Sequence, residues 1–353
     1  KPILYLLFLF INIKVYILVL MIKKVLILGT SSFGGSSLEK YLKDKKIKVI
    51  GTYNQKKNIF YQQHRFSKNK NFFKSYKINF LNERDITKLK KIINKEKPEY
   101  IIDFASICMV NESWDMPKYY FKVNCLSKVT ILDFLKNKKF LKSYIYISTP
   151  EVFGSNNFSV KENCQIFNPS TPYAASKLFV EKLIKVYNSN FHIPFNICRF
   201  SNFYGIGQPN YRLIPKVICS IILKTKFPLQ GNGKSLRNFI DAYDFSNGLF
   251  KVMQRGKNKQ TYHFSSKKLY KVIDIIIEIC SLYKIDHKKL IRSVTDRQGK
   301  DFKYNLNSNF TRQALRWDDK IDLSINLLKI TNYYDMNKKS LLKLDLNYKK
   351  SIR

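Results

Sequence analysis

The sequence predicts an α/β fold in which a doubly wound parallel sheet is followed by a smaller C-terminal α/β lobe. Two observations lead to this prediction. Short apolar runs, beginning with residues 25–28, are uninterrupted by polar residues, as expected of strands buried on both faces of a parallel sheet. These runs alternate with stretches of helical periodicity, the first at Leu38, Tyr41 and Leu42, and this alternation is typical of βαβ units.

Length and composition indicate a globular protein. The chain has 353 residues, enough for one large domain and a smaller one. Its apolar content of 45% excludes a disordered chain. The net charge is +39, from 64 Lys+Arg against 25 Asp+Glu. Because the basic residues are spread along the chain without a nucleic-acid motif, we attribute the charge to biased composition and expect no nucleic-acid partner.

The cysteines and histidines give no sign of disulfides or metal. The six cysteines are far apart and form no C-x-x-C, so we expect reduced, mostly buried thiols of a cytoplasmic protein. The four histidines are isolated, and no metal site is expected.

Residues 1–20 are nearly all apolar and are long enough to cross a bilayer. They would run almost without a linker into the first strand, and Met21 heads the segment MIKKVLILG. We therefore favour an upstream stretch that is absent from the native protein and expect no membrane partner. A membrane anchor is the alternative.

The first strand is followed by a glycine-rich turn, residues 29–35, that opens a helix. Glycines in such a turn let the backbone approach a pyrophosphate at a helix N-terminus. An ordinary strand-to-helix turn is the structural alternative. The later elements are expected in order: strands at residues 48–51, 77–81, 100–104, 144–147 and 195–200, and helices at 86–93, 117–136 and 173–188.

Chemistry concentrates between residues 148 and 177. Tyr173 and Lys177 are four apart, so on a helix they share one face. A lysine ammonium there would lower the pKa of the phenol, which could then remove a proton from a sugar hydroxyl. Ser148, Thr149 and Glu151 follow an apolar strand at its carboxyl end, where open α/β sheets bind ligands. The pattern indicates a redox active site.

Taken together, these features resemble the extended short-chain dehydrogenase/reductase superfamily, in its nucleotide-sugar branch, the NAD-dependent epimerase/dehydratase family. The turn resembles G-x-x-G-F-I-G, with Ser32 at the middle glycine. Asn79 stands where the family often has an adenine-contacting aspartate, and Asn124 at its buried asparagine. The segment at Ala105 resembles H-x-A-A beneath the nicotinamide ribose, with Asp103 replacing the histidine. The resemblance implies cofactor contacts at Gly29, Ser32, Phe33, Gly35, Asn79, Ala105, Asn124, Tyr173 and Lys177.

The expected cofactor is a tightly bound NAD or NADP. An NAD enzyme usually has an acid after the second strand, whereas this chain has none there and continues into Lys56 and Lys57. This leans slightly towards NADP.

Later segments resemble motifs that bind a sugar nucleotide. Asn202 lies in a stretch like R-x-x-N-x-Y-G-P-G-Q, and Leu213 begins an L-I-P. Arg237 lies in a stretch like R-x-F-I-x-V-x-D, and arginine suits a diphosphate because its planar donors pair bidentately with the oxygens. Asp296 heads a stretch like the D-R-x-G-H-D of 4,6-dehydratases. The implied substrate contacts are Asn202, Arg212, Leu213, Arg237 and Arg297.

The resemblance leaves several activities open. All begin with oxidation at the sugar C4, with Tyr173 as base and Thr149 or Ser148 holding the oxygen. Glu151 fits the base that removes the C5 proton in a 4,6-dehydratase, the leading hypothesis, with dTDP-glucose as substrate. Pro150 cannot supply the acid that aspartate provides in many relatives, so Glu151 or a held water would protonate the leaving group. The alternatives are a C4 epimerase, a UDP-glucuronate decarboxylase, or a non-catalytic NAD(P)-binding protein.

The resemblance also implies a domain division and a homodimer. Residues 21–205 would form mainly a Rossmann-like dinucleotide-binding domain, and residues 206–334 mainly the sugar-nucleotide lobe. Residues 237–265 would partly return to the first domain, and 335–353 would form a basic tail. Relatives dimerise by packing the helices at 117–136 and 173–188 into a four-helix bundle.

Overall fold

A computed structural model describes residues 22–54, 73–296, 299 and 301–341. The apolar residues 1–20, the lysines at 56 and 57, and the expected substrate contact Arg297 lie outside the described residues. Within the described part of the chain, none of the helices combines the length and apolar character needed to cross a membrane.

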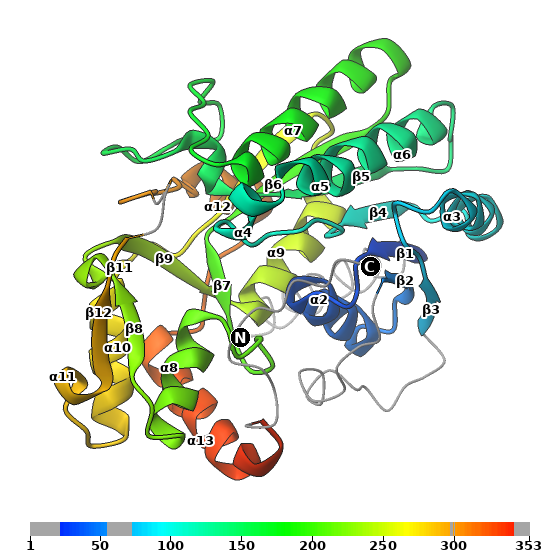
Figure 1. The fold of residues 1–353 in the computed structure, drawn as a ribbon. Coiled ribbons are helices and arrows are strands. Elements are labelled where there is room, and N and C mark those ends of the chain that lie inside the picture. Colours follow the sequence, from blue (N-terminus) through cyan, green and yellow to red (C-terminus); the bar gives the residue numbers. More distant parts are fainter. Residues whose placement is uncertain (1–21, 55–72, 297–298, 300, 342–353) are drawn as a thin grey trace, which may run out of the picture.

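A seven-stranded sheet forms the centre of the larger lobe, with strand order β10-β6-β5-β4-β1-β2-β3 (Figure 1). All its neighbouring strands are parallel. The order reverses between β1 and β4, which creates a crevice at their carboxyl ends. The predicted doubly wound fold is confirmed. The strands are β1 Lys24–Leu28, β2 Lys48–Tyr53, β3 Phe73–Lys77, β4 Tyr100–Asp103, β5 Ser143–Ser148, β6 Phe195–Phe200 and β10 Gln260–Phe264.

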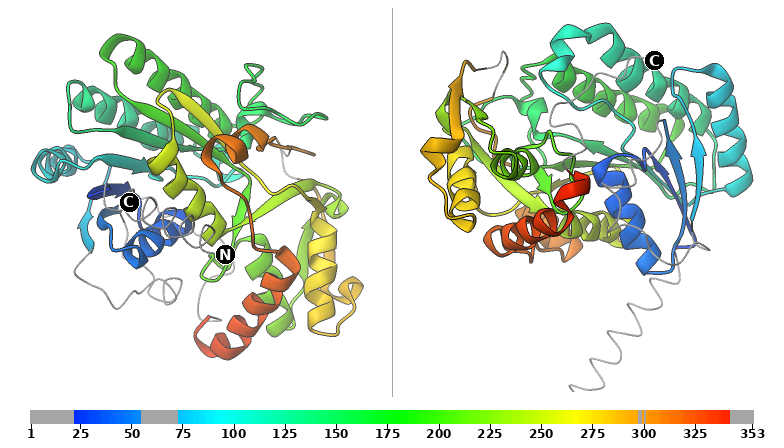
Figure 2. Two further views of the ribbon diagram at one scale, coloured as in Figure 1. Left: turned by 180° about the vertical axis from the view of Figure 1, so that it is seen from behind. Right: turned by 60° about the horizontal axis from the view of Figure 1, so that its bottom comes forward.

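Helices cover both faces of this sheet. Figure 2 shows the layers from two further sides. One face packs on α3, α6 and α7, whose apolar side chains meet Leu26, Leu28 and Tyr144. The other packs on α2 and α9, which meet Val25 and Ile27. The bounds are α2 Phe33–Asp44, α3 Glu83–Glu96, α4 Glu112–Asp115, α5 Pro117–Phe121, η3 Lys122–Leu126, α6 Ser127–Leu135, η4 Pro150–Phe153, α7 Pro172–Phe191, α9 Ala242–Arg255 and α12 Asn309–Leu315.

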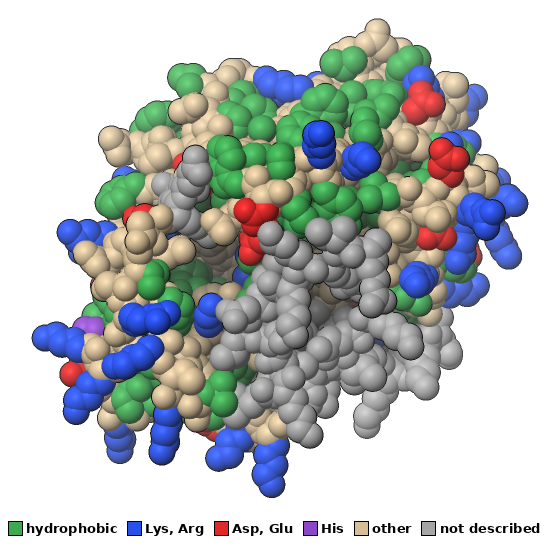
Figure 3. Space-filling view, in the orientation of Figure 1, with side chains coloured by type: hydrophobic (Ala, Val, Ile, Leu, Met, Phe, Trp, Pro, Cys, Tyr) green, Lys and Arg blue, Asp and Glu red, His purple; other side chains and the backbone are tan. Residues whose placement is uncertain are grey.

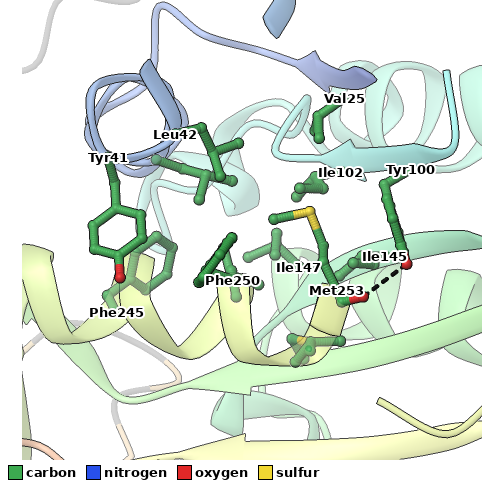
Figure 4. Close-up of a cluster of buried hydrophobic side chains, with 14 of the residues drawn as sticks. Val25, Tyr41, Leu42, Tyr100, Ile102, Ile145, Ile147, Phe245, Phe250 and Met253 are labelled. Carbon is green, nitrogen blue, oxygen red and sulfur yellow. Dashed lines mark hydrogen bonds between the residues drawn. The ribbon is translucent and has the colours of Figure 1, made fainter. Parts of the chain in front are cut away.

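The core between α2, α9 and the sheet is shown in Figure 4. Leu42, Ile102 and Phe250 are almost completely buried there, and burying a side chain of this size contributes about 1.5–3 kcal/mol. The Tyr100 hydroxyl, at the amino end of β4, donates a 2.7 Å hydrogen bond to the Met253 carbonyl oxygen. This core fixes the position of α2, whose N-terminus lies just after the carboxyl end of β1.

The smaller lobe has its own apolar core, built around Ile214, Ile218 and Ile276. It contains a three-stranded sheet, β11-β9-β7, and a two-stranded sheet, β12-β8. Its β9 is followed by α9 and β10, which lie in the larger lobe (Figure 1). The bounds are β7 Asn202–Tyr204, α8 Leu213–Ile222, β8 Phe227–Gln230, η5 Gly231–Gly233, β9 Leu236–Asp241, β11 Leu269–Lys271, α10 Val272–Leu282, α11 His287–Leu290, β12 Ile291–Val294 and α13 Leu323–Leu341.

Several sequence-based boundaries differ from the structure; the helix expected at 86–93, for example, spans Glu83–Glu96. The third strand is Phe73–Lys77, not 77–81, because this edge strand is largely exposed and lacks an apolar run. The helix expected at 117–136 contains a π-helical turn, η3, between α5 and α6. The basic tail was expected from residue 335, but α13 continues to Leu341. Among the cysteines, Cys108 is exposed, Cys164 is half-buried and the other four are buried.

Candidate active site

The glycine-rich turn lies at the N-terminus of α2, against the end of β4. Gly29 has a φ of +87°, and a Cβ there would come within 3.1 Å of the Ala105 nitrogen. A Cβ at Gly35 would lie 2.4 Å from the Gly29 carbonyl oxygen. Both positions therefore require glycine. The turn presents the N-terminal end of a 12-residue helix to the crevice, where backbone N–H groups favour an anion.

The departures from the family's glycine pattern have local explanations. Ser32 is the N-cap of α2: its hydroxyl accepts from the Gly35 N–H at 3.0 Å and donates to the Gly29 carbonyl at 2.8 Å. Gly34 replaces an aliphatic residue because a Cβ there would lie 2.8 Å from the Phe104 ring. Phe33 stacks on Phe203, with ring centroids 5.5 Å apart. The altered loop is thus internally satisfied and still opens to the crevice.

The segment after β4 runs beneath the expected cofactor position. The Ala105 N–H donates to Asp103 Oδ1 at 2.8 Å. Asn124 is fully buried, and its amide bonds both the N–H and the carbonyl of Ile107 and also the Ser176 hydroxyl. Through Asn124, these hydrogen bonds hold the segment after β4 to α7.

The expected catalytic residues converge at the carboxyl end of β5. Thr149 is the N-cap of η4, the short helix that carries Glu151. The Thr149 hydroxyl hydrogen-bonds the Tyr173 phenol. The Ser148 hydroxyl is buried and has no hydrogen-bond partner among the described residues. Pro150 occupies the first position of η4, where proline suits a helix start.

The pKa of Tyr173 corrects one expectation. Burial, followed by the negative charge of Glu151, raises this pKa well above its usual value of 10, whereas the Thr149 hydrogen bond and Arg212 lower it. Lys177 shares the α7 face with Tyr173, but its Nζ hydrogen-bonds the Ser106 hydroxyl at 3.1 Å. Tyr173 is therefore not a phenol of lowered pKa in this arrangement, and Lys177, whose side chain reaches Ser106, is not among the largest influences on it. A lowering of the phenol pKa by Lys177 stays a prediction.

Burial lowers the pKa of Lys177 itself to about 8. Its Nζ lies 4.2 Å from the centre of the Tyr146 ring. The Lys177 ammonium thus lies between the Ser106 hydroxyl and the face of the Tyr146 ring. At mildly alkaline pH its protonated and neutral forms are both well populated.

Arg212 extends from the smaller lobe into the same site. It is the N-cap residue of α8, which Leu213 begins. Its Nη2 donates to the Cys108 sulfur at 3.1 Å, and its charge acts on Tyr173. The charge of an arginine from one lobe thus acts on the Tyr173 phenol of the other.

Arg237 and Asn202 lie deeper in the smaller lobe. Arg237 donates to the carbonyl oxygens of Leu236, Asp301 and Phe302 at 2.8, 2.5 and 3.0 Å. Its guanidinium stacks 4.2 Å from the Tyr304 ring centre. These contacts tie Arg237 to the segment that follows Arg297.

Two further expected contacts are oriented by local hydrogen bonds. Asn202 Oδ1 accepts a 3.2 Å hydrogen bond from the Tyr304 hydroxyl. Asn79, just past β3, accepts from the Leu81 N–H at 3.0 Å through its side-chain oxygen. Both remain predictions as ligand contacts.

Sequence reasoning missed Cys108, Tyr304 and Lys128 as neighbours of these groups. Cys108 follows β4 at the sheet's carboxyl edge, and that position was the available signal. Lys128 is one of 64 Lys+Arg residues and gave none.

Comparisons with known proteins agree with this geometry. The model of the NAD dependent epimerase/dehydratase family matches residues 25–265. A dTDP-D-glucose 4,6-dehydratase of Dictyostelium discoideum is 29% identical over 90% of this chain and 84% of its own length. The dTDP-glucose 4,6-dehydratase of Haemophilus influenzae is 25% identical over 72% of this chain and 82% of its own.

Solved structures share the fold. The dTDP-glucose 4,6-dehydratase DesIV of Streptomyces venezuelae, crystallised with NAD, superposes with a TM-score of 0.81 at 20% identity. The match covers 90% of this chain and 98% of DesIV. A UDP-glucuronic acid 4-epimerase of Bacillus cereus, also with NAD, gives a TM-score of 0.79 at 23% identity, covering 89% and 99% of the two chains.

Proposed function

The chain belongs to the NAD dependent epimerase/dehydratase family, and from this membership we propose that it is a nucleotide-sugar 4,6-dehydratase acting on dTDP-glucose. Two relatives that match 90% and 72% of its length carry that name. The observation that carries the proposal is the pairing of Glu151 with Tyr173, in which the carboxylate acts electrostatically on the phenol. A dehydratase needs a second base beside the one that serves C4, and a carboxylate next to the phenol supports the assignment of Glu151 to that role.

The residues of the crevice fit a dinucleotide cofactor. Gly29 and Gly35 allow the tight turn that brings the α2 N-terminus to the crevice, since a Cβ at either position would collide with the protein's own backbone. The backbone N–H groups there suit a pyrophosphate, and Lys177 and Ser106 lie beside the β4 segment. The family description favours NAD over the slight NADP lean of the sequence. When bound, NAD would take a hydride from the sugar C4 and return it at C6.

Tyr173 would act as the base at C4. Its raised pKa keeps the phenol protonated in the free protein, so proton removal requires positive charge nearby. Arg212 supplies one such charge. Thr149, bonded to the phenol, would hold the C4 oxygen with the adjacent Ser148, whose buried hydroxyl is available to donate.

Glu151 would remove the C5 proton, which a C4 ketone makes acidic. The oxygen leaving C6 then needs a proton. Pro150 is buried at the start of η4 and has no acidic group. We therefore propose that Glu151 passes its newly acquired proton to the leaving hydroxyl, directly or through a water, so that base and acid are one residue. When hydride is added at C6, a proton from solvent, delivered through Glu151, would replace the one lost from C5.

A panel of substrates tests this function. Protein beginning at Met21 is incubated with NAD and with dTDP-, UDP-, GDP- or CDP-glucose or with UDP-glucuronate, and products are identified by mass. We expect loss of one water from dTDP-glucose, and a much smaller yield from the others. Unchanged mass with inverted C4 stereochemistry would show an epimerase, the second candidate favoured by the fold match to a 4-epimerase. Loss of carbon dioxide from UDP-glucuronate would show a decarboxylase.

We further propose a homodimer formed by α5, η3, α6 and α7. These helices expose large apolar side chains that a monomer would leave in water, and Figure 3 shows apolar side chains gathered over this part of the surface. The residues, with their exposed fractions, are Phe121 38%, Leu126 59%, Phe179 43%, Val186 57% and Phe191 43%. A cytoplasmic location is proposed from the reduced thiols.

Charge on this surface should break the dimer. In a Leu126→Glu/Val186→Glu variant, two exposed apolar residues become buried charges in the interface, so sedimentation should show monomers with an unchanged fold. Ile277→Glu on α10 is the control, since Ile277 is also exposed (40%) but lies on the smaller lobe. A monomeric parent protein, or a double variant that still dimerises, would refute the interface.

A further inference from the structure

A fully buried ion pair lies beneath the active site, at the position where the family pattern has a histidine. Lys128 Nζ of α6 lies 3.0 Å from Asp103 Oδ2 at the end of β4, and both side chains are 0% exposed. The Tyr144 hydroxyl also donates to Asp103. Burying two charges is costly unless each is fully partnered, and this pair lies outside the glycine-rich turn.

Both charges are also bonded to the segment that follows β4. Asp103 Oδ1 accepts from the Ala105 N–H at 2.8 Å, and Lys128 Nζ donates to the Ala105 carbonyl oxygen at 2.6 Å. One peptide segment is thus held at its N–H and its carbonyl by the two halves of the pair. The next residue is Ser106, whose hydroxyl accepts from Lys177 Nζ.

We propose that Asp103 and Lys128 are positioning residues for the nicotinamide side of the site: their ion pair fixes residues 104–107 and sets the charge that surrounds Lys177. The inference rests on the proposed use of Lys177 in cofactor binding and catalysis. It also explains why replacing histidine with Asp103 need not disable the site, since Lys128 neutralises the new carboxylate.

The electrostatics around Lys177 are consistent with this role. Burial is the largest influence and lowers its pKa; Asp103 raises the pKa, and Lys128 lowers it. The other titratable or polar groups that face Lys177 are Cys108 after β4, Glu181 on α7, Cys125 on η3, the Tyr146 ring on β5 and the Ser106 hydroxyl. The two halves of the pair therefore act on Lys177 in opposite directions.

Because the two charges act on the pKa of Lys177 in opposite directions, their removal gives a test that residues with only a structural role would fail. Asp103→Asn removes a charge that favours the ammonium, so Lys177 should lose its proton at lower pH. Lys128→Met removes a charge that disfavours it, so Lys177 should keep its proton to higher pH. We expect the NADH affinity, measured by fluorescence against pH, to fall at high pH. Compared with the parent protein, this fall should occur at lower pH in Asp103→Asn and at higher pH in Lys128→Met. Shifts of about half a pH unit or more in opposite directions are expected.

Controls separate this effect from loss of fold. Lys24→Met breaks the Lys24–Glu96 ion pair (2.8 Å) at the amino end of β1 and should leave the pH profile unchanged. If either single variant fails to fold, Asp103→Asn/Lys128→Met leaves no buried charge unpaired. Because Asp103 has a larger influence than Lys128 on the pKa of Lys177, this double variant should lose NADH affinity at a lower pH than the parent protein. The shift should be smaller than that of Asp103→Asn. Shifts in the same direction for the two single variants, or no shift in any folded variant, would overturn the proposal.

The NADH measurement uses no sugar nucleotide, so it remains readable if the dehydratase assignment fails. In that case the parent protein would yield no dehydrated product while the two binding profiles still moved apart. Failure of the ion-pair proposal would leave product formation intact and the binding profiles superimposed.

Discussion

Replacement of Tyr173 by phenylalanine is expected to lower kcat by about 10²- to 10⁴-fold, the usual contribution of a positioned acid–base group. The Tyr173 side chain is buried, so its ring should keep its place even when the hydroxyl and its hydrogen bond to Thr149 are removed. Affinity for NADH and for the sugar nucleotide should therefore change little. Steady-state kinetics and fluorescence titration measure the two effects separately.

The matched control is Tyr100→Phe, which removes another buried hydroxyl, bonded to the Met253 carbonyl at the opposite end of β4. This change should cost about 0.5–1.5 kcal/mol of stability and leave kcat unchanged. Near-normal turnover in Tyr173→Phe would exclude the phenol as the base, and a protein that binds ligands with no turnover even before mutation would favour a non-catalytic role.

Replacement of Glu151 by glutamine should stop water loss while C4 oxidation continues. The amide keeps the shape of the side chain but cannot remove the C5 proton, so dehydration should fall by about 10²- to 10⁴-fold. Reduced cofactor should then accumulate and be visible by its absorbance. Because the negative charge of Glu151 raises the pKa of Tyr173, glutamine should lower that pKa and move the acid limb of C4 oxidation to lower pH.

A suitable control for this change is Glu162→Gln. Glu162 lies in the same connecting segment between β5 and α7, and its Oε1 accepts from the Thr311 N–H and hydroxyl, which a glutamine oxygen can replace. Its dehydration rate should be close to normal. Dehydration at a normal rate in Glu151→Gln would remove Glu151 from the mechanism.

Much of the fold was predictable because the signals are local. Residues 25–28 form an unbroken apolar run, and β1 in the structure contains them. The third strand was missed because Phe73–Lys77 lies at the sheet edge, where polar side chains face water and no apolar run is needed. The π-helical turn η3 was missed because its sequence has no helix breaker.

The sequence indicated which residues come together in the site, but not which contacts their side chains make. The spacing of Tyr173 and Lys177 places them on one helix face, and α7 contains both. The direction of the Lys177 ammonium depends on Ser106 and on the Tyr146 ring, which belong to other elements. The pairing of Asp103 with Lys128 joins residues 25 apart in sequence, and no periodicity indicates such a contact.

The measurement that tests the central claim most directly is the conversion of dTDP-glucose labelled with deuterium at C4. A 4,6-dehydratase should give a product that has lost one water and keeps the deuterium, now at C6, because the hydride taken from C4 is returned to C6. A product of unchanged mass, with the label still at C4, would contradict a 4,6-dehydratase and identify the C4 epimerase chemistry instead.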